Sequence, residues 1–524
     1  MKTKISEGKT YLGIEFGSTR IKAVLTDDTY TPVASGAHDW ENQFENGYWT
    51  YSEQAILDGL RDCFSSLADD VKRKYGVSLK TVGAIGISGM MHGYLPFDRD
   101  YRLLAPFRTW RNTTTEQAAD ALTETFGFNI PQRWSCAHLY QAMLNREPHV
   151  PSIAYVNTLA GYVHYRLTGR HEVGVGEASG ILPIENGDYN PKMIKELQRL
   201  TAEAGYDLNI RALLPTVRRA GESGAYLTEA GAALLDETGT LCAGIPLCPP
   251  EGDAGTGMVA TNAVRPATGN ISAGTSVFSM LVLERPLGGI YREIDVVTTP
   301  DGAPVAMVHS NNGCSEIDAC VGMLDEFTEL IGTKVEKSRL YDLFYHTAMK
   351  GEPDCGGNIS YNFLAGEPVA GVRAGHPMYY RESGRKLTLA SLFRSQIYAA
   401  IAPVKLGMDD LAKNEAVRTE RFSAHGGLFK TAGVAQGMLA DALKVPITVQ
   451  TTAGEGGAWG MALLAAYMMC KEDLSLDVWL EEKVFSKTEK STLSPNAEGV
   501  DGFDRYMSGY RKGLAAQRSM DGEE

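Results

Sequence analysis

Two short segments place glycine and hydroxyl side chains between runs of apolar residues, one in GIEFGSTRIKAV and one in ISAGTSVFSMLV. Backbone amides of such turns can bind phosphate without much positive charge, and glycine allows the close approach that a Cβ would block. An ordinary hairpin uses the same residue types, so each segment alone is a weak signal. Their recurrence about half the chain length apart favours a duplicated fold with one phosphate-binding turn in each copy. The turn residues are Gly17, Ser18 and Thr19 in the first copy and Gly274, Thr275 and Ser276 in the second.

Three charged side chains accompany these turns. Asp253, in PPEGDAGTG, lies between glycines shortly before the second copy. Aspartate is common in ordinary turns, but we favour a general base here because the paired turns imply a phosphate site at the domain junction. Glu15 precedes the first turn, where a carboxylate would repel a polyphosphate unless Mg²⁺ lay between them, and an exposed strand end explains it equally well. Lys22 could contact a phosphate, although a lone lysine is more often simply solvated.

A further group of side chains suits a polar organic substrate. SGMMHGY places Met91 and His92 at the end of an expected strand, and ligands bind at the carboxyl ends of strands in α/β sheets. In RTWRNTTT, Trp110 offers a flat apolar face for a sugar, and Asn112 offers both a donor and an acceptor. In isolation, a lone histidine is more often structural, and the tryptophan and asparagine fit packing and turn roles better.

Charge and composition exclude several classes of protein. The 524 residues are 44% hydrophobic and 22% charged, which is typical of a globular protein with two or more domains. The net charge of −14 argues against a nucleic-acid groove or an anionic membrane surface. Eight scattered cysteines show no metal spacing and indicate reduced thiols. The first residues lack the apolar core of a secretory signal, and GMALLAAYMMC is too short to span a bilayer, so we expect a cytoplasmic protein without membrane contact.

Strand and helix patterns alternate around these residues, which predicts an α/β fold. Proline and glycine cluster at 248–262, where we expect a domain boundary. Residues 113–213 are richer in helix and loop patterns and suit an inserted substrate-binding region. Neither a Walker-type phosphate loop nor a strict dinucleotide-binding glycine pattern occurs. The strands are expected at 11–17, 21–26 and 82–88, and the helices at 52–74, 387–411 and 459–470.

Taken in chain order, these motifs resemble those of the FGGY carbohydrate kinases, sugar kinases of the actin/Hsp70-like ATPase superfamily. The resemblance runs from Tyr11 to about Tyr467 and implies two duplicated ribonuclease H-like α/β domains flanking a central cleft. It implies a sugar-binding N-terminal domain at 1–256 with the first phosphate hairpin, and a nucleotide-binding C-terminal domain at 257–524 with a helical tail. The matching segments are GIEFGSTRIKAV, EGDAGTGMV, ISAGTSVF, FLAGE, HGGLFKTAGVAQGMLADAL and EGGAWGMALLAAY.

The resemblance also implies substrates, a metal and roles for residues of this chain. The substrates would be ATP and a sugar, the catalytic base would be Asp253, and Mg²⁺ would lie at Glu15. A homodimer is also an expectation, because dimers are common in the family. The sugar-binding residues would be Met91, His92, Trp110, Asn112 and Asp253. The ATP-binding residues would be Gly17, Ser18, Thr19, Lys22, Gly274, Thr275, Ser276, Gly426, Gly427 and Lys430.

The segment GMMHG is similar to the Met-His-Gly segment of xylulokinases, where glycerol kinases carry an Arg-Glu pair. The expected reaction is therefore transfer of the ATP γ-phosphate to the terminal hydroxyl of a ketopentose, D-xylulose. Ribulose, another ketose or a polyol stays open as the substrate. A non-catalytic ATP-binding switch and a nicotinamide-dependent sugar oxidoreductase are the alternatives of other classes. The chain departs from the family pattern at Glu15, where an aspartate is usual, at Arg111-Asn112 and Ala254, and at Pro368, where an arginine is usual.

Overall fold

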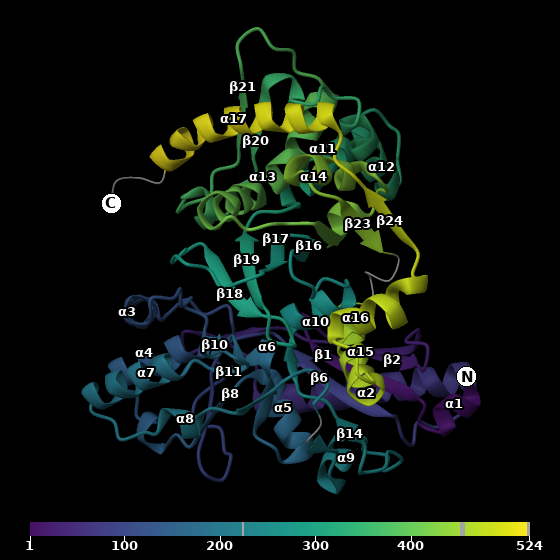
Figure 1. Ribbon diagram of the computed structural model, residues 1–524. Coiled ribbons are helices and arrows are strands. Elements are labelled where there is room, and N and C mark those ends of the chain that lie inside the picture. Colours follow the sequence, from purple (N-terminus) through teal and green to yellow (C-terminus); the bar gives the residue numbers. More distant parts are fainter. Residues whose placement is uncertain (223–224, 451–455, 521–524) are drawn as a thin grey trace. The chain divides into compact units, whose positions relative to one another are not determined.

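The computed structural model describes residues 1–222, 225–450 and 456–520 (Figure 1). The chain forms two compact units, and neither is one continuous stretch. Unit 1 comprises Met1–Val264, Asp295–Val305 and Glu455–Lys487. Unit 2 comprises Arg265–Ile294, Ala306–Gly454 and Thr488–Glu524. The chain thus returns to unit 1 twice. The domain boundary expected between residues 256 and 257 stays a prediction.

Unit 1 is built on a mixed sheet centred on β1 (Thr10–Phe16). β1 pairs antiparallel with β2 (Arg20–Asp27) across the first glycine-hydroxyl turn, and parallel with β6 (Ala84–Gly89) on its other side. These three strands lie within two residues of the expected bounds. The strand order is β13-β14-β6-β1-β2-β3, and β15 also pairs with β6. The other strands of this sheet are β3 (Pro32–Asp39), β13 (Ala225–Tyr226), β14 (Pro246–Leu247) and β15 (Glu251–Gly252).

Two long helices cover opposite faces of this sheet. α15 (Gly456–Cys470) packs so closely on β1 that a Cβ at Gly13 would lie 2.1 Å from a backbone oxygen of the helix. α2 (Glu53–Tyr75) approaches β3 in the same way at Gly36, where a Cβ would lie 2.3 Å from a helix carbonyl. Gly36 of β3 pairs with Ala23 of β2, which in turn pairs with Ile14 of β1, so Gly36 is in register with the residue next to Gly13. Because neighbouring strand residues point to opposite faces, the sheet is sandwiched between the two helices.

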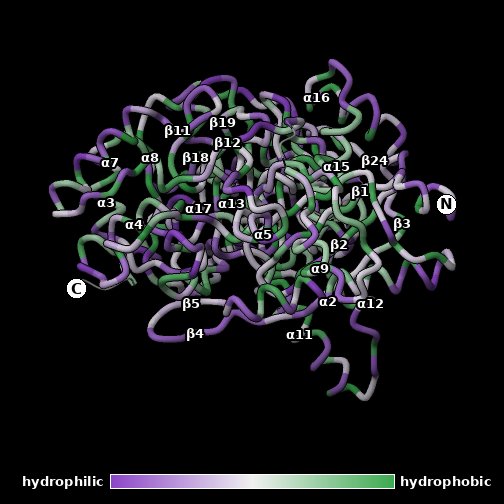
Figure 2. The backbone as a smooth tube through the Cα atoms, turned by 90° about the horizontal axis from the view of Figure 1, so that it is seen from below, coloured by the Kyte–Doolittle hydropathy of each residue, from purple (hydrophilic) through white to green (hydrophobic). Residues whose placement is uncertain are grey.

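The remaining elements of unit 1 are short, and the loop that carries β4 projects as a largely hydrophilic segment (Figure 2). Among the residues that the structure describes, no helix has both the length and the apolar character needed to cross a bilayer. All eight cysteines are free thiols. The remaining helices are α1 (Lys2–Ser6), α3 (Glu116–Phe126), α4 (Ser135–Leu144), α5 (Leu159–Thr168), α6 (Val175–Ala178), α7 (Pro191–Glu203), α8 (Ile210–Leu213), α9 (Glu229–Leu235), α10 (Asp253–Ala260) and α16 (Leu476–Trp479). The remaining strands are β4 (Gln43–Glu45), β5 (Tyr48–Thr50), β7 (Leu95–Phe97), β8 (Tyr155–Asn157), β9 (Glu172–Gly174), β10 (Ile184–Glu185), β11 (Asp188–Tyr189) and β12 (Thr216–Arg218).

Unit 2 repeats the central scheme of unit 1. β16 (Thr268–Ala273) pairs antiparallel with β17 (Val277–Val282) across the second glycine-hydroxyl turn, and parallel with β22 (Arg421–His425) on its other side. The strand order is β18-β19-β17-β16-β22-β23-β24. The duplicated two-domain α/β fold expected from the sequence is thereby confirmed. The other strands of this sheet are β18 (Ile294–Thr298), β19 (Pro304–Ser310), β23 (Ile447–Gln450) and β24 (Lys490–Leu493), and β20 (Asn358–Tyr361) and β21 (Met378–Arg381) form a separate pair. Residues 295–305, which include most of β18, belong to unit 1.

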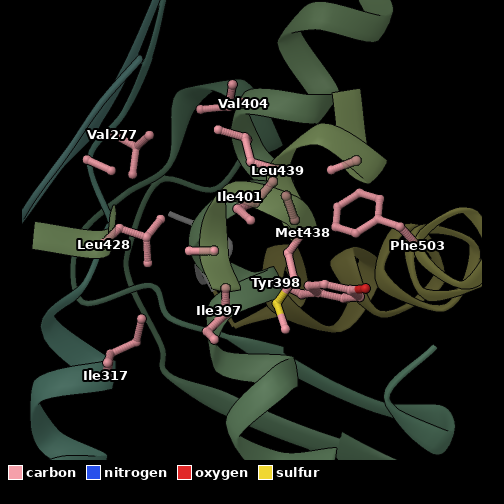
Figure 3. Close-up of a cluster of buried hydrophobic side chains, with 14 of the residues drawn as sticks. Val277, Ile317, Ile397, Tyr398, Ile401, Val404, Leu428, Met438, Leu439 and Phe503 are labelled. Atoms are coloured by element: carbon pink, nitrogen blue, oxygen red, sulfur yellow. The ribbon is translucent and has the colours of Figure 1, made fainter. Parts of the chain in front are cut away.

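The core of unit 2 forms around α13 (Leu389–Glu415) (Figure 3). Ile397, Ile401 and Val404 lie one turn apart along this helix and are almost completely buried. They pack with side chains from β17, α14 (Val434–Leu443) and α17 (Ala497–Ser519). Burying side chains of this size contributes about 1.5–3 kcal/mol each, so this cluster fixes the helices to the sheet. α11 (Ser315–Leu330) and α12 (Lys337–Ala348) complete the unit.

Candidate active site

The first glycine-hydroxyl turn directs its three carbonyl oxygens into the protein. The Gly17 carbonyl accepts the indole N–H of Trp40 at 2.8 Å, and the Ser18 carbonyl accepts the phenol of Tyr51 at 2.5 Å. The Thr19 carbonyl accepts the backbone N–H of Trp40 at 3.1 Å. Within the described residues, the amides of Ser18 and Thr19 have no hydrogen-bond partner. The turn can therefore offer two backbone donors to an anion.

The second turn in unit 2 is held in a similar way. The Gly274 carbonyl accepts the backbone N–H of Cys314 at 2.8 Å, and the Thr275 carbonyl accepts that of Gly313 at 2.7 Å. The Gly274 amide closes the turn on the Ser276 carbonyl at 2.9 Å. In the part of the chain that the structure describes, no partner is seen for the amides of Thr275 and Ser276. Each unit thus has a glycine-hydroxyl turn with two backbone amides that lack a partner among the described residues.

The glycine pair expected near the nucleotide lies beside this second turn. A Cβ at Gly426 would lie 2.2 Å from the carbonyl oxygen of Ala273, the last residue of β16, and the φ of Gly426 is +107°. Both the contact and the dihedral angle therefore require glycine. Gly427 and Lys430 follow and are exposed. Unit 2 thus brings the second turn and Gly426 together, and the role of all these residues in binding ATP stays a prediction.

Asp253 is the first residue of α10 and follows β15, which pairs in parallel with the end of β6. The segment after β6 supplies a donor, because the backbone N–H of Met91 lies 3.3 Å from Oδ1 of Asp253. The carboxylate keeps access to solvent. Desolvation by the surrounding protein nevertheless raises the pKa of Asp253 to about 6, against the opposing effect of the Met91 and Ala254 amides. A carboxylate with this pKa is ionised at neutral pH and is still basic enough to accept a proton.

Glu15 lies on β1 close to Asp253. Its Oε2 accepts a long hydrogen bond from the Thr256 hydroxyl at 3.5 Å, and a Cβ at Gly457 would lie only 1.6 Å from that oxygen. Desolvation, and then the charge of Asp253, raise the pKa of Glu15 to about 8, while Lys22 opposes the rise. No cluster of three His, Cys, Asp or Glu side chains suited to a metal occurs among the described residues. Mg²⁺ commonly takes only one or two protein carboxylates besides phosphates and water, so Glu15 remains a reasonable ligand.

His92 is buried next to this carboxylate loop and is 5% exposed. Its Nδ1 lies 3.3 Å from the carbonyl of Gly180, and its ring stacks on Trp134 with ring centroids 5.8 Å apart. Burial, followed by the charge of Arg133, lowers the pKa of His92 to about 3, so the ring is neutral. Because a carbonyl can only accept, Nδ1 carries the proton and Nε2 is left as a hydrogen-bond acceptor. Such an acceptor suits a substrate hydroxyl.

Trp110 and Asn112 are both engaged with the protein. The indole N–H of Trp110 donates to the Ser18 hydroxyl at 3.2 Å, which links the predicted sugar face to the first turn. The Asn112 amide donates to the carbonyls of Trp49 and Thr109 at 2.8 and 3.0 Å, and it accepts the Trp49 N–H at 2.8 Å. Asn112 is 2% exposed. Its hydrogen bonds thus hold the β5 segment, and no free amide donor is left for a sugar.

The structure adds residues that sequence reasoning did not identify. Glu251 is buried just before the Asp253 loop, and its carboxylate accepts the backbone N–H of Glu177 at 2.9 Å. Thr256 links Ser88 on β6, at 3.2 Å, to Glu15. The only signal in the sequence was that Glu251 lies next to the glycine-flanked aspartate. Nothing near Glu177 indicated its position, because it comes from a segment far away in the chain.

Two family models match the chain over most of its length. The model of the FGGY family of carbohydrate kinases, N-terminal domain, matches residues 10–259. The model of its C-terminal domain matches residues 269–469. The chain belongs to the FGGY family of carbohydrate kinases. It is therefore a phosphotransferase that acts on a sugar, and FGGY kinases use ATP. This confirms the family and enzyme class expected from the motifs, and it sets aside the non-catalytic and oxidoreductase alternatives.

Named relatives refine the comparison. The xylulose kinase of Haemophilus influenzae is 22% identical over 520 residues, which cover 95% of this chain and 99% of the relative. The structure of a xylulose kinase from Rhodospirillum rubrum superposes with a TM-score of 0.80 at 17% identity, over 98% of this kinase and 99% of that chain. A gluconate kinase from Lactobacillus acidophilus gives a TM-score of 0.78 at 16% identity with the same coverage of each chain. At these identities the solved structures establish the shared fold.

Proposed function

We propose that this FGGY kinase transfers the γ-phosphate of ATP to the terminal hydroxyl of a ketopentose, D-xylulose, with Asp253 as the general base. The observation that carries the proposal is the position of the Asp253 carboxylate. It is held by the Met91 amide at 3.3 Å, and the next residue is His92 with its neutral acceptor nitrogen. A base and a hydroxyl acceptor on adjacent segments suit a substrate with several hydroxyl groups.

In the proposed reaction, Asp253 takes the proton of the terminal hydroxyl as the oxygen attacks the γ-phosphorus. The bond from that phosphorus to the β,γ-bridging oxygen breaks, and ADP leaves. The unused amides of Ser18, Thr19, Thr275 and Ser276 donate to phosphate oxygens as negative charge redistributes. General-base catalysis supplies about 10²–10⁴-fold of the rate, so positioning and electrostatic stabilisation must provide the remainder.

Mg²⁺ is the metal that fits these donors. Glu15 provides carboxylate oxygens, which are the ligands that Mg²⁺ prefers. Its Oε2 has only the long contact to Thr256 among the described residues that can donate to it. Lys22 lies opposite Glu15 on the β1–β2 ladder and can act alongside the metal toward a phosphate. When bound, Mg²⁺ would neutralise phosphate charge, while Glu15 would orient the metal or its water ligands.

D-Xylulose is proposed on the basis of the Met91–His92 segment and of the curated relatives, which are named xylulose kinases. The test is ADP release with Mg-ATP and a panel of D-xylulose, ribulose, ketohexoses, polyols and gluconate, with the phosphorylated product identified by mass spectrometry. We expect the highest kcat/KM with D-xylulose. A higher value with another member would reassign the substrate, and turnover of none would refute the proposed reaction. The cytoplasmic location and the homodimer stay predictions.

The assignment of the base is tested by Asp253→Asn. Turnover is expected to fall about 10²–10⁴-fold, while ATP binding persists. The matched control is Asp236→Asn, because Asp236 is a buried turn aspartate that binds the Thr238 hydroxyl and the Leu241 amide. Asp236→Asn is expected to leave kcat nearly unchanged. Near-wild-type turnover by the Asp253 variant would remove it from the mechanism.

A further inference from the structure

Glu177 is a buried acid that the proposed chemistry does not use. It lies in α6 and is fully inaccessible to solvent. Neither carboxyl oxygen has a hydrogen-bond partner within the described residues. The nearby Thr158 hydroxyl does not reach hydrogen-bond geometry, and desolvation raises the pKa of Glu177 well above its ordinary value. A buried polar group without a partner is rare enough in native structures to require an explanation.

The position of the Glu177 carboxyl group offers an explanation for its burial without a partner. A Cβ placed on Gly252 would lie 2.6 Å from Oε2 of Glu177 and 2.1 Å from Cγ of Met91. Glu177 and Met91 thus meet at Gly252, the residue immediately before Asp253. The backbone N–H of Met91 is the donor that holds the Asp253 carboxylate. The Glu177 side chain therefore packs against both segments that this hydrogen bond joins.

The segment that carries Glu177 is itself firmly held. Its backbone N–H groups at Gly176 and Glu177 donate to the Glu251 carboxylate at 3.4 and 2.9 Å. The Ser179 hydroxyl accepts the backbone N–H of Thr298 at 3.0 Å. At its end, the Gly180 carbonyl accepts from His92. One short stretch of chain thus contacts both the loop that carries the base and the histidine proposed to bind the sugar.

We propose that Glu177, as a neutral carboxylic acid, is a positioning residue that packs against Gly252 and Met91 and so keeps the Met91 amide directed at Asp253. The neutral form follows from the geometry, because full burial with no cation and no donor in hydrogen-bond geometry among the described residues disfavours a charge. A neutral acid also adds no negative charge where a polyphosphate must approach. The link to catalysis rests on the proposed function of Asp253, whereas the packing and the hydrogen bond do not.

The proposal predicts that volume and polarity at this position matter and that charge does not. Glutamine has nearly the same shape as a protonated glutamate, so Glu177→Gln should preserve the arrangement. Glu177→Ala removes the contact with Gly252 and Met91. Should the alanine variant fail to fold, Glu177→Asp withdraws the carboxyl group by one methylene and tests the same contact. The matched control is Glu172→Gln, because Glu172 is buried on the same segment but is paired with Arg218 at 3.1 Å.

The decisive readout is hydrogen exchange, which does not depend on activity. In the full-length protein, Glu177→Ala is expected to speed exchange of peptides spanning Ser88–Gly93 at least about tenfold, because the Met91 hydrogen bond opens more often. Glu177→Gln and Glu172→Gln should leave this exchange within about threefold of wild type. Unchanged exchange in Glu177→Ala, fast exchange in Glu177→Gln, or the same acceleration in Glu172→Gln would each overturn the proposal.

Kinetics then test the link to catalysis. With the preferred sugar, Glu177→Ala should lower kcat at least about tenfold and change the KM for ATP less than about twofold, and Glu177→Gln should restore kcat. A merely destabilised protein would not show this separation or this rescue. If the wild-type protein phosphorylates no sugar, the proposed function fails, and the exchange result still decides the role of Glu177.

Discussion

The raised pKa of Asp253 has a consequence for stability that is independent of turnover. An acid whose pKa is about 6 in the folded protein and 3.8 when unfolded binds its proton more tightly in the folded state. The folded state therefore loses relative stability as pH rises from 3.8 to 6, and the full cost persists at higher pH. Asp253→Asn removes this cost. We expect the variant to turn over about 10²–10⁴-fold more slowly than wild type and yet to be more stable than wild type above pH 6.

The size of the effect follows from the shift. A change of about two pKa units corresponds to about 3 kcal/mol, but the carboxylate reaches solvent, so screening reduces the expected gain to about 1 kcal/mol. The assay is thermal and urea unfolding of both proteins between pH 4.5 and pH 8. The stabilisation should be largest at pH 8 and should shrink toward pH 4.5.

Asp236→Asn serves as the control in the same assay. Burial opposes ionisation of Asp236, but its hydrogen bonds to the Thr238 hydroxyl and to turn amides hold the pKa of Asp236 below its ordinary value. This control variant should therefore lose stability at pH 8. An Asp253→Asn protein that is no more stable than wild type at pH 8 would refute the reasoning that the folded protein disfavours the charged carboxylate.

Three further outcomes are expected. The acid limb of the kcat/KM profile should have its midpoint near pH 6, so that about a tenth of the Asp253 carboxyl groups are ionised at pH 5. The residual activity of Asp253→Asn should lack this acid limb, and an acid limb that persists in the variant would assign the titration to another group. Gly457→Ala should raise the Mg²⁺ concentration needed for half-maximal rate, because the new Cβ would lie 1.6 Å from Oε2 of Glu15 and forces that side chain to move. The control Gly322→Ala, on an open helix surface, should leave the Mg²⁺ requirement unchanged. Equal Mg²⁺ requirements in the two variants would count against Glu15 as a ligand. Asn112→Ala should lower the free energy of unfolding by about 2 kcal/mol, because the backbone groups of Trp49 lose their hydrogen-bond partners. An unchanged urea midpoint together with a raised KM for the sugar would instead favour direct contact between Asn112 and the sugar.

Local signals in the sequence were sufficient to predict the central elements of each unit. The helix expected at 52–74 forms at Glu53–Tyr75, because Ser52 caps its first turn and Gly76 ends it in the left-handed conformation. The two hairpins were visible because glycine and hydroxyl residues interrupt apolar strands at both places. The return of the chain to unit 1 could not be predicted. α15 is apolar on nearly all sides, so its sequence predicts burial but does not indicate which sheet it covers.

The candidate site was predictable where residue type and local position coincide. Asp253 and His92 each follow a strand, and the structure brings both to the end of β6. Glu177 and Glu251 escaped detection because their contact joins residues that are 74 positions apart. Asn112 shows a limit of such reasoning, since an amide that binds backbone looks the same in sequence as one that binds a sugar; its contact with a sugar stays a prediction. Tertiary contacts decide these roles.

The central proposal is that each glycine-hydroxyl turn binds phosphate groups of ATP through backbone amides that have no partner among the described residues. Hydrogen exchange measured by mass spectrometry, with and without saturating Mg-ATP, tests it most directly. The account predicts slower exchange in peptides that contain Ser18 and Thr19 and, at the same ATP concentration, in those that contain Thr275 and Ser276. Protection of one turn alone, or of neither, would contradict it.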